Sequence, residues 1–226
     1  ANVSHELRTP LTTIKSYVEA LDDGALEEPE LAKRFVGVIR GESNRMIRLV
    51  NDLLHLSRLD SNQERFRPIE VNVREMLEEV SDRFSFQMKQ KGIGGSVLIE
   101  DGIDTAWFDR DQIDQVLDNL MSNAIKYTQD GGHIEIAARK PTPDTVSISV
   151  KDNGMGIPEK DQARIFERFY RVDKARSRNM GGTGLGLSIA REIIKAHGGT
   201  IELESELGRG TTVTFTLPLH RGGDAG

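Results

Sequence analysis

Apolar residues recur at helical spacing along residues 1–62. Between Leu7 and Leu21 they are four, three, four and three positions apart, which makes a heptad stripe along one helix face. A second stripe predicts another helix that begins near Pro29, because proline suits the first turn of a helix. Asp22-Asp23-Gly24 separates the two, so these residues are predicted to form a helical hairpin. The second stripe contains Leu31, Phe35, Val38, Ile39, Met46, Leu49, Val50, Leu53 and Leu56.

This second stripe is wider than one partner helix can cover. A second copy of the hairpin would cover it, giving a four-helix bundle and a homodimer. The alternative is that the stripe packs against the rest of the same chain.

The pattern changes after residue 62. Residues 63–70 are polar around Pro68 and are predicted to be a linker, and residues 71–220 mix helical with alternating segments. Asn72-x-x-Glu75 and Asp109-x-x-Gln112 are capping boxes, which predict helix starts. Residues 221–226 are predicted to be a tail. Helices are predicted over 72–92, 109–128, within 158–170 and over 185–197, strands over 96–100, 105–108, 133–139, 145–150, 200–204 and 211–217, and a mobile basic loop over 171–180.

Composition narrows the function classes. The chain has 226 residues, a formal net charge of −6 and no cysteine. The negative charge argues against a nucleic-acid binder, and the absence of cysteine excludes disulfides and thiolate metal sites. No apolar run approaches the roughly 20 residues of a membrane span. Because only four residues precede His5, we expect a soluble fragment of a longer protein.

His5 opens a candidate reactive centre. It lies about 200° around the helix from the apolar stripe, so it is predicted to face solvent, and Thr9 follows one turn later. Glu6 places a carboxylate beside the imidazole. The ordinary alternative is a surface histidine without function. Likewise, the Thr9 hydroxyl can bond back to the helix backbone instead of meeting a ligand.

One face of the helix predicted over 109–128 carries ligand-binding chemistry. Asn119, Asn123 and Tyr127 are four residues apart, and Lys126 lies beside them. An amide oxygen suits Mg²⁺, an amine suits phosphate and an aromatic ring can stack on a base. The alternative is a solvated polar face.

Three further clusters follow. In Asp152-Asn153-Gly154-Met155-Gly156-Ile157-Pro158 the glycines allow close backbone approach, and the aspartate can accept a hydrogen bond from an exocyclic amine. Residues 181–187, Gly-Gly-Thr-Gly-Leu-Gly-Leu, open a helix and offer backbone N–H groups to phosphate. Residues 166–171 combine aromatic rings with arginines. A plain glycine turn, or core packing with surface charge, remains the alternative for each.

In this order, the five motifs resemble the bacterial sensor histidine kinases, most of all the cell-wall sensor kinases of Gram-positive bacteria. They match the H-box at His5, the N-box at 119–128, the G1 box at 152–158, the F-box at 166–171 and the G2 box at 182–187. The resemblance implies a hairpin that forms a four-helix bundle on dimerisation, followed by an α+β two-layer ATP-binding sandwich. It also implies that His5 is phosphorylated, that Glu6 is the general base, that Thr9 serves a phosphatase activity, and that Asn123, with Asn119 assisting, holds Mg²⁺. The implied ATP-binding residues are Asn119, Asn123, Lys126, Tyr127, Asp152, Gly154, Gly156, Ile157, Phe166, Arg168, Arg171, Gly182, Thr183, Gly184, Leu185, Gly186, Leu187 and Thr212.

The resemblance further implies autophosphorylation from ATP and Mg²⁺, transfer to an aspartate of a response regulator, and a place on the cytoplasmic side of the membrane in the full-length protein. Two alternatives stay open. One is an ATPase or serine kinase of the related gyrase and chaperone superfamily, against which the H-E-x-x-T sequence at His5 argues. The other is a dimerisation scaffold without catalysis, against which the intact ATP-binding motifs argue.

Overall fold

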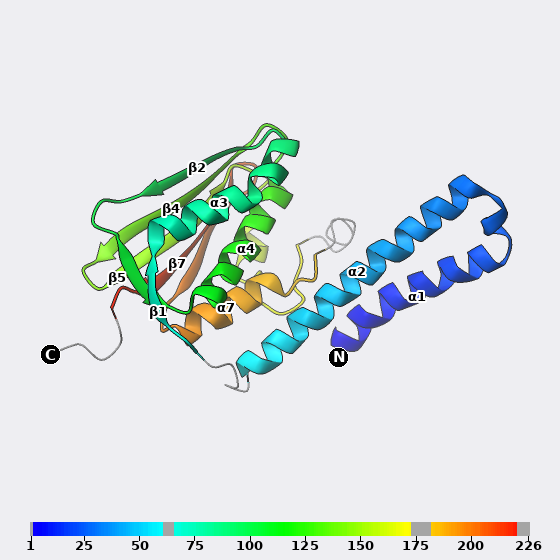
Figure 1. Ribbon diagram of the computed structural model, residues 1–226, viewed down its shortest axis with the longest axis horizontal. Coiled ribbons are helices and arrows are strands. Elements are labelled where there is room, and N and C mark those ends of the chain that lie inside the picture. Colours follow the sequence, from blue (N-terminus) through cyan, green and yellow to red (C-terminus); the bar gives the residue numbers. More distant parts are fainter. Residues whose placement is uncertain (1, 61–65, 173–181, 221–226) are drawn as a thin grey trace.

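The chain forms a helical hairpin joined to an α/β sandwich (Figure 1). The computed structural model describes residues 2–60, 66–172 and 182–220. The tail and most of the basic loop predicted from the sequence lie outside these residues.

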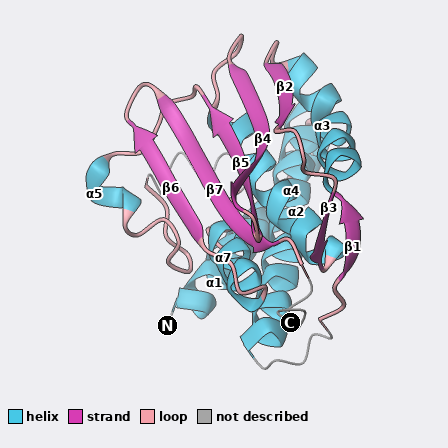
Figure 2. Cartoon of the chain, turned by 90° about the vertical axis from the view of Figure 1, so that its left-hand side faces the viewer, coloured by secondary structure: helices cyan, strands magenta, loops and turns pink. Residues whose placement is uncertain are grey.

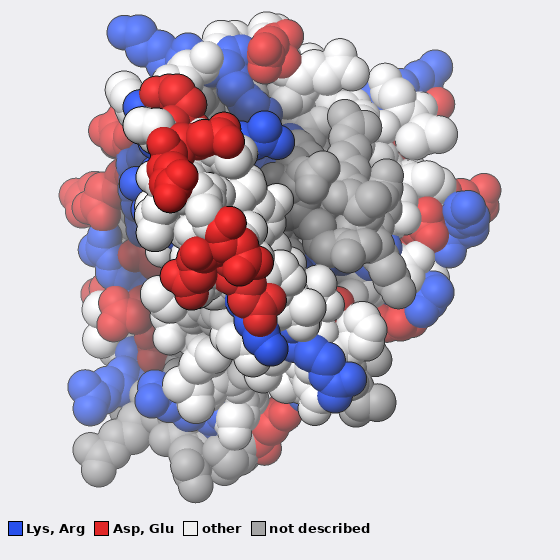
Figure 3. Space-filling model, turned by 90° about the vertical axis from the view of Figure 1, so that its right-hand side faces the viewer, with Lys and Arg blue, Asp and Glu red and all other residues white. Residues whose placement is uncertain are grey.

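Two long helices make the hairpin. Helix α1 (Asn2–Asp22) and helix α2 (Pro29–Asp60) run side by side and are joined by the 3-10 helix η1 (Ala25–Glu27). Gly24 starts the turn at a φ of 115°, a conformation that favours glycine. The turn end carries exposed acidic side chains, which gather on the face shown in Figure 3: Asp22, Asp23, Glu27, Glu28 and Glu30.

The hairpin exposes apolar side chains that a single chain does not cover. Leu11 on α1 is 57% exposed, and Ile47 and Leu54 on α2 are 59% and 52% exposed. Val18, Val36 and Val50 add to this surface. Apolar groups along two adjacent helices are typical of a helix-packing surface.

The other part of the second stripe packs within the chain. Leu49 and Leu56 are 2% and 3% exposed and belong to the core cluster of the sandwich, and Leu53 packs against that cluster. Helix α2 contacts helix α7 (Gly186–Ala196) in this region. The packing of the stripe against the same chain, stated above as the alternative, is therefore correct for these three leucines.

The sandwich has a sheet on one side and helices on the other (Figure 2). Among the described residues, five strands form this sheet in the order β2-β4-β5-β7-β6, antiparallel except for the parallel β2–β4 pair. The strands are β2 (Gly94–Ile99), β4 (His133–Thr142), β5 (Thr145–Asp152), β6 (Ile201–Glu206) and β7 (Gly210–Pro218). The helices are α3 (Val73–Gln90), α4 (Arg110–Tyr127), α7 and the short α5 (Glu159–Gln162).

Strand alternation explains why one face of the sheet is covered. Val146, Ile148 and Val150 on β5 and Phe215 and Leu217 on β7 are buried, whereas the residues between them are only partly buried. Apolar side chains on one face of a strand pack against the helices, and polar ones on the other face meet solvent. This confirms the two-layer α/β fold.

The N-cap bond of both predicted capping boxes is confirmed, but the reciprocal bond is not formed at Asp109, whose N–H donates to His197 Nε2 at 3.2 Å. Asn72 accepts a hydrogen bond from the Glu75 N–H at 3.1 Å, and Asp109 accepts one from the Gln112 N–H at 3.3 Å. One strand was not predicted from the sequence. Residues 69–72 form β1 (Ile69–Asn72), which pairs with β3 (Thr105–Phe108). Residues 69 and 70 of the predicted linker are therefore part of a two-stranded ribbon, while the domain bounds stay a prediction.

Candidate functional site

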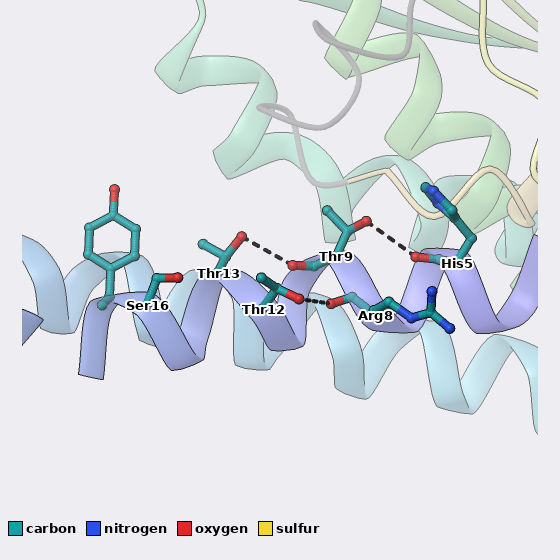
Figure 4. A pocket seen from close by; sticks show the side chains of 7 residues that line it. His5, Arg8, Thr9, Thr12, Thr13 and Ser16 are labelled. Atoms are coloured by element: carbon teal, nitrogen blue, oxygen red, sulfur yellow. Dashed lines mark hydrogen bonds between the residues drawn. The ribbon is translucent and has the colours of Figure 1, made fainter. Parts of the chain in front are cut away.

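His5 stands exposed on α1, as its helical position predicts. His5, Thr9 and Thr13 point to the same side of the helix and line a surface pocket of about 580 Å³ (Figure 4). The Thr9 hydroxyl donates to the His5 carbonyl oxygen at 3.2 Å, which is the backbone bond considered above as the alternative. A phosphate-sized group at His5 would therefore find both imidazole and hydroxyl within one helical turn.

Glu6 is held by arginines from two parts of the chain. Arg45 on α2 donates through Nη2 to Glu6 Oε2 at 3.2 Å, and Arg171 donates through Nη2 to the same oxygen at 2.9 Å. The side chains of Arg45 and Arg171 are only 6% and 5% exposed. Arg45 is not among the residues predicted from the sequence, because nothing in the helical pattern marks a pair separated by 39 residues.

The polar face of α4 looks toward the glycine-rich segment. Asn119 donates through Nδ2 to the Gly186 carbonyl oxygen at 3.2 Å, so the start of α7 lies against α4. Asn123, Lys126 and Tyr127 are partly buried on the same helix. Lys126 Nζ lies 5.0 Å from the centroid of the Tyr127 ring. These side chains are neither buried in the core nor fully solvated, which suits a ligand-lining surface.

Asp152 ends β5 with a buried carboxylate. Its Oδ1 accepts from the Gly154 N–H at 2.8 Å, and the residue is 9% exposed. Burial raises the pKa of Asp152, and hydrogen bonds from the backbone of Gly154 and Thr211 oppose that rise. A Cβ at Gly154 would lie 2.4 Å from the Tyr127 carbonyl oxygen, so only glycine fits there. The G1 segment thereby packs tightly onto the end of α4.

The sheet register places the predicted residue Thr212 relative to Asp152. Thr212 pairs with Lys151 on β5, whereas Thr211 pairs with Asp152. Paired residues of antiparallel strands point to the same face, so Thr212 faces the open side of the sheet and Thr211 shares the face of Asp152. The role of Thr212 in ATP binding stays a prediction, and the register adds Thr211 as a candidate because it shares the face of Asp152.

The rest of the G1 segment is anchored to β6. The Ile157 N–H donates to Ser205 Oγ at 2.8 Å, and Gly156 adopts a φ of 66°. A Cβ at Gly156 would lie 2.0 Å from the Glu206 carbonyl oxygen, so the chain passes too close for any side chain. These glycines are explained by tight packing, which leaves Asp152 as the group of this motif with chemistry to offer.

The glycine-rich segment is described from residue 182 onward. Gly184 has a φ of 77°, and its carbonyl oxygen accepts from the Phe169 N–H at 2.8 Å. Phe169 itself has a φ of 65°, which is rare for an aromatic residue and marks local strain. Leu185, the next residue after Gly184, is fully buried. The F-box and G2 motifs therefore form one connected structure. Gly182, Leu187 and Phe166 are partly buried within it.

This structure also contacts the hairpin through polar groups. Arg168 donates to both carboxylate oxygens of Asp60, at 3.0 and 2.7 Å. The Thr183 hydroxyl donates to Asp52 Oδ2 at 2.7 Å, while burial raises the pKa of Asp52 against the effect of that bond. Each of the predicted ATP-binding residues Arg168, Arg171 and Thr183 thus binds a hairpin carboxylate.

The described residues contain no cluster of three or more His, Asp or Glu side chains arranged to hold a metal ion. No helix in the described part of the chain combines the length and apolar character of a membrane span.

Comparison with known proteins agrees with this architecture. Residues 1–62 match the "His Kinase A (phospho-acceptor) domain", and residues 108–221 match the "Histidine kinase-, DNA gyrase B-, and HSP90-like ATPase" family. The "Sensor histidine kinase WalK" of Bacillus subtilis is 50% identical over 219 residues, which are 96% of this chain and 36% of that protein. The chain thus spans about a third of the length of this relative.

Solved structures give the same result. The histidine kinase ThkA in complex with the response regulator protein TrrA superposes with a TM-score of 0.79 and 30% identity, covering 97% of this chain and 60% of that chain. The catalytic domain of ThkA alone gives a TM-score of 0.60 and 35% identity, covering 68% of this chain and 98% of that one. The chain therefore belongs to the histidine kinase family, as a WalK-type core that joins a phospho-acceptor hairpin to an ATP-binding domain.

Proposed function

We propose that this chain transfers the γ-phosphoryl group of ATP to His5 and then to an aspartate of a response regulator. The observation that carries the proposal is the bond from Arg171 to Glu6 at 2.9 Å. The same guanidinium donates to the Thr183 carbonyl oxygen at 2.7 Å, in the glycine-rich segment. One side chain therefore joins the candidate phosphate site to the residue next to the candidate acceptor.

The residues around the ATP-binding domain fit a magnesium nucleotide. Asp152 offers a buried carboxylate, which suits the exocyclic amine of adenine, and Thr211 lies beside it. Asn123 is the candidate Mg²⁺ ligand, with Asn119 nearby on the same face, and Lys126 is the candidate phosphate contact. Bound Mg²⁺ would neutralise charge on the phosphates as the phosphoryl group leaves.

His5 is the proposed nucleophile. One imidazole nitrogen forms a bond to the γ-phosphorus while the bond from that phosphorus to the bridging oxygen of ADP breaks. Glu6 accepts the proton from the other nitrogen, which keeps the attacking nitrogen electron-rich. The exposed position of His5 allows a phosphoryl donor and later a regulator to approach it.

The similarity to ThkA, whose solved complex contains a response regulator, supports an aspartate of such a protein as the next acceptor. Thr9 is the candidate residue for the reverse activity, removal of phosphate from the regulator. Its hydroxyl already lies one turn from His5 and can orient a water molecule by exchanging its bond to the His5 carbonyl oxygen.

The exposed apolar surface of the hairpin supports a homodimer. Leu11, Ile47 and Leu54 are each more than half exposed, and the phospho-acceptor family is typically dimeric. In the longer protein, this part would work on the cytoplasmic side of the membrane, where ATP is available.

The test is incubation with γ-labelled ATP and Mg²⁺, followed by acid and alkali treatment of the protein. We expect label that survives alkali and is lost in acid, as a phosphohistidine requires. His5→Gln should abolish the label and leave nucleotide binding intact. Acid-stable label would instead support a serine kinase, and absence of label with normal nucleotide binding would support a scaffold.

A further inference from the structure

Arg45 does not contact His5 in the described bonds but binds Glu6, the residue next to it. It lies on α2, is 5% exposed, and its guanidinium donates to the carboxylate next to His5. Its second carboxylate neighbour, Glu42, lies one turn earlier on the same helix, with 3.5 Å between Arg45 Nη1 and Glu42 Oε2. A buried guanidinium requires such partners, because an unpaired buried charge is costly.

The bond between Arg45 and Glu6 joins the two helices of the hairpin. Both residues belong to regular helices, so the geometry of the pair is set by the packing of α1 against α2. The bond to Arg171 differs, because that arginine is the last residue of the F-box, in the ATP-binding part of the chain. One partner of Glu6 is therefore built into the hairpin, and the other belongs to the ATP-binding domain.

We propose that Arg45 is a positioning residue for the phosphorylation of His5, which it serves by holding the carboxylate of Glu6, and that Arg171 is an exchangeable second partner. The proposal rests on the function proposed above. With Arg171 bound to Glu6, one carboxylate oxygen is shared between two guanidinium groups. When Arg171 turns to the nucleotide phosphates, Arg45 keeps the carboxylate in place beside the imidazole.

The chemistry of the two arginines supports this division. Guanidinium groups bind phosphate as well as carboxylate, so phosphates near Thr183 would compete with Glu6 for Arg171. Arg45 is not placed to exchange its partner for phosphate, because it is buried between the hairpin helices and its described partners are the carboxylates of Glu6 and Glu42. Its contribution should therefore appear in the rate of phosphorylation and not in nucleotide binding.

The experiment compares Arg45→Met, Arg45→Lys and the control Arg40→Met in the homodimer as purified. Arg40 lies on the same helix but is exposed, so its replacement makes the same chemical change at the surface. We expect Arg45→Met to lower kcat for His5 phosphorylation roughly 10- to 100-fold, which is at most the lower end of the roughly 100- to 10,000-fold contribution of a general base, and to leave the KM for ATP unchanged. Arg45→Lys should restore part of the rate, and Arg40→Met should equal the unmutated protein.

A double-mutant cycle separates positioning from a general structural effect. Because Arg45 acts through Glu6, adding Arg45→Met to Glu6→Gln should produce no further loss of kcat. The proposal would be overturned if the losses of kcat in the two single variants multiply in the double variant. A raised KM with unchanged kcat, or a normal rate, in Arg45→Met would also overturn it. Should Arg45→Met not fold, the same cycle is run with Arg45→Lys. Absence of label on His5 in the unmutated protein would instead refute the proposed function.

Discussion

Replacing Asp152 by asparagine should separate adenine recognition from folding. The change keeps the shape of the side chain and an oxygen for the Gly154 N–H, which lies 2.8 Å from Oδ1. It removes the charge that would strengthen a bond to the adenine amine. Bonds to charged groups contribute about 1.5–3 kcal/mol and neutral ones about 0.5–1.5 kcal/mol. The expected loss is therefore about 1–1.5 kcal/mol, roughly a five- to twelve-fold rise in the Kd for ADP.

The same substitution should stabilise the protein without nucleotide. Burial raises the pKa of Asp152, so the folded state disfavours the ionised carboxylate. Ionisation then lowers the stability as pH rises from the unfolded value of about 3.8 through the raised folded pKa. At neutral pH the neutral asparagine avoids this cost, and the Tm should rise.

Calorimetric titration with ADP and with inosine diphosphate gives the decisive comparison. Inosine diphosphate lacks the amino group, so the unmutated protein should prefer ADP and Asp152→Asn should lose most of that preference. The matched control is Asp144→Asn, because Asp144 is an exposed aspartate that directly precedes the first residue of β5. An unchanged preference for ADP in Asp152→Asn would refute the assigned contact, and a lowered Tm would refute the burial argument.

Three further results are expected. Thr9→Ala should keep autophosphorylation and slow the dephosphorylation of the regulator; an unchanged dephosphorylation rate would remove Thr9 from that reaction. Leu54→Glu should weaken the dimer in sedimentation at micromolar concentration, since burying an unpaired charge costs several kcal/mol; an unchanged mass would place the interface elsewhere. Burial lowers the pKa of His197, whose Nε2 accepts from the Asp109 N–H at 3.2 Å, so its stabilising effect should be lost as pH falls from about 6.5 through the lowered pKa. His197→Gln should flatten this part of the pH dependence of the Tm, and an unchanged slope would contradict the assignment.

The helices were predictable because their signals are local. The capping groups Asn72 and Asp109 lie three residues from the N–H groups they accept from, so sequence spacing alone locates both helix starts. Strand β1 was missed because its pairing with β3 is determined by contacts more than thirty residues away, as in the pair of Glu70 with Trp107. The four residues of β1 are too few to show an alternating pattern that would predict a strand.

The candidate site was predictable as a set of motifs but not as a geometry. The faces of Thr211 and Thr212 depend on the register of β7 with β5, which a shift of one residue reverses. Similarly, Leu49 and Leu53 carry the same apolar signal as the exposed Leu54, and only the position of α7 decides which of them it covers. The pairing of Arg45 with Glu6 likewise depends on how two helices pack.

The proposed function requires that the ATP-binding domain phosphorylates His5. It is tested most directly by locating the phosphoryl group with tandem mass spectrometry, after incubation with ATP and Mg²⁺ and digestion under alkaline conditions that preserve phosphohistidine. The phosphoryl group is expected on His5, in the peptide that contains residues 4–8. A phosphoryl group on another residue, or none in a protein that binds ATP, would contradict it.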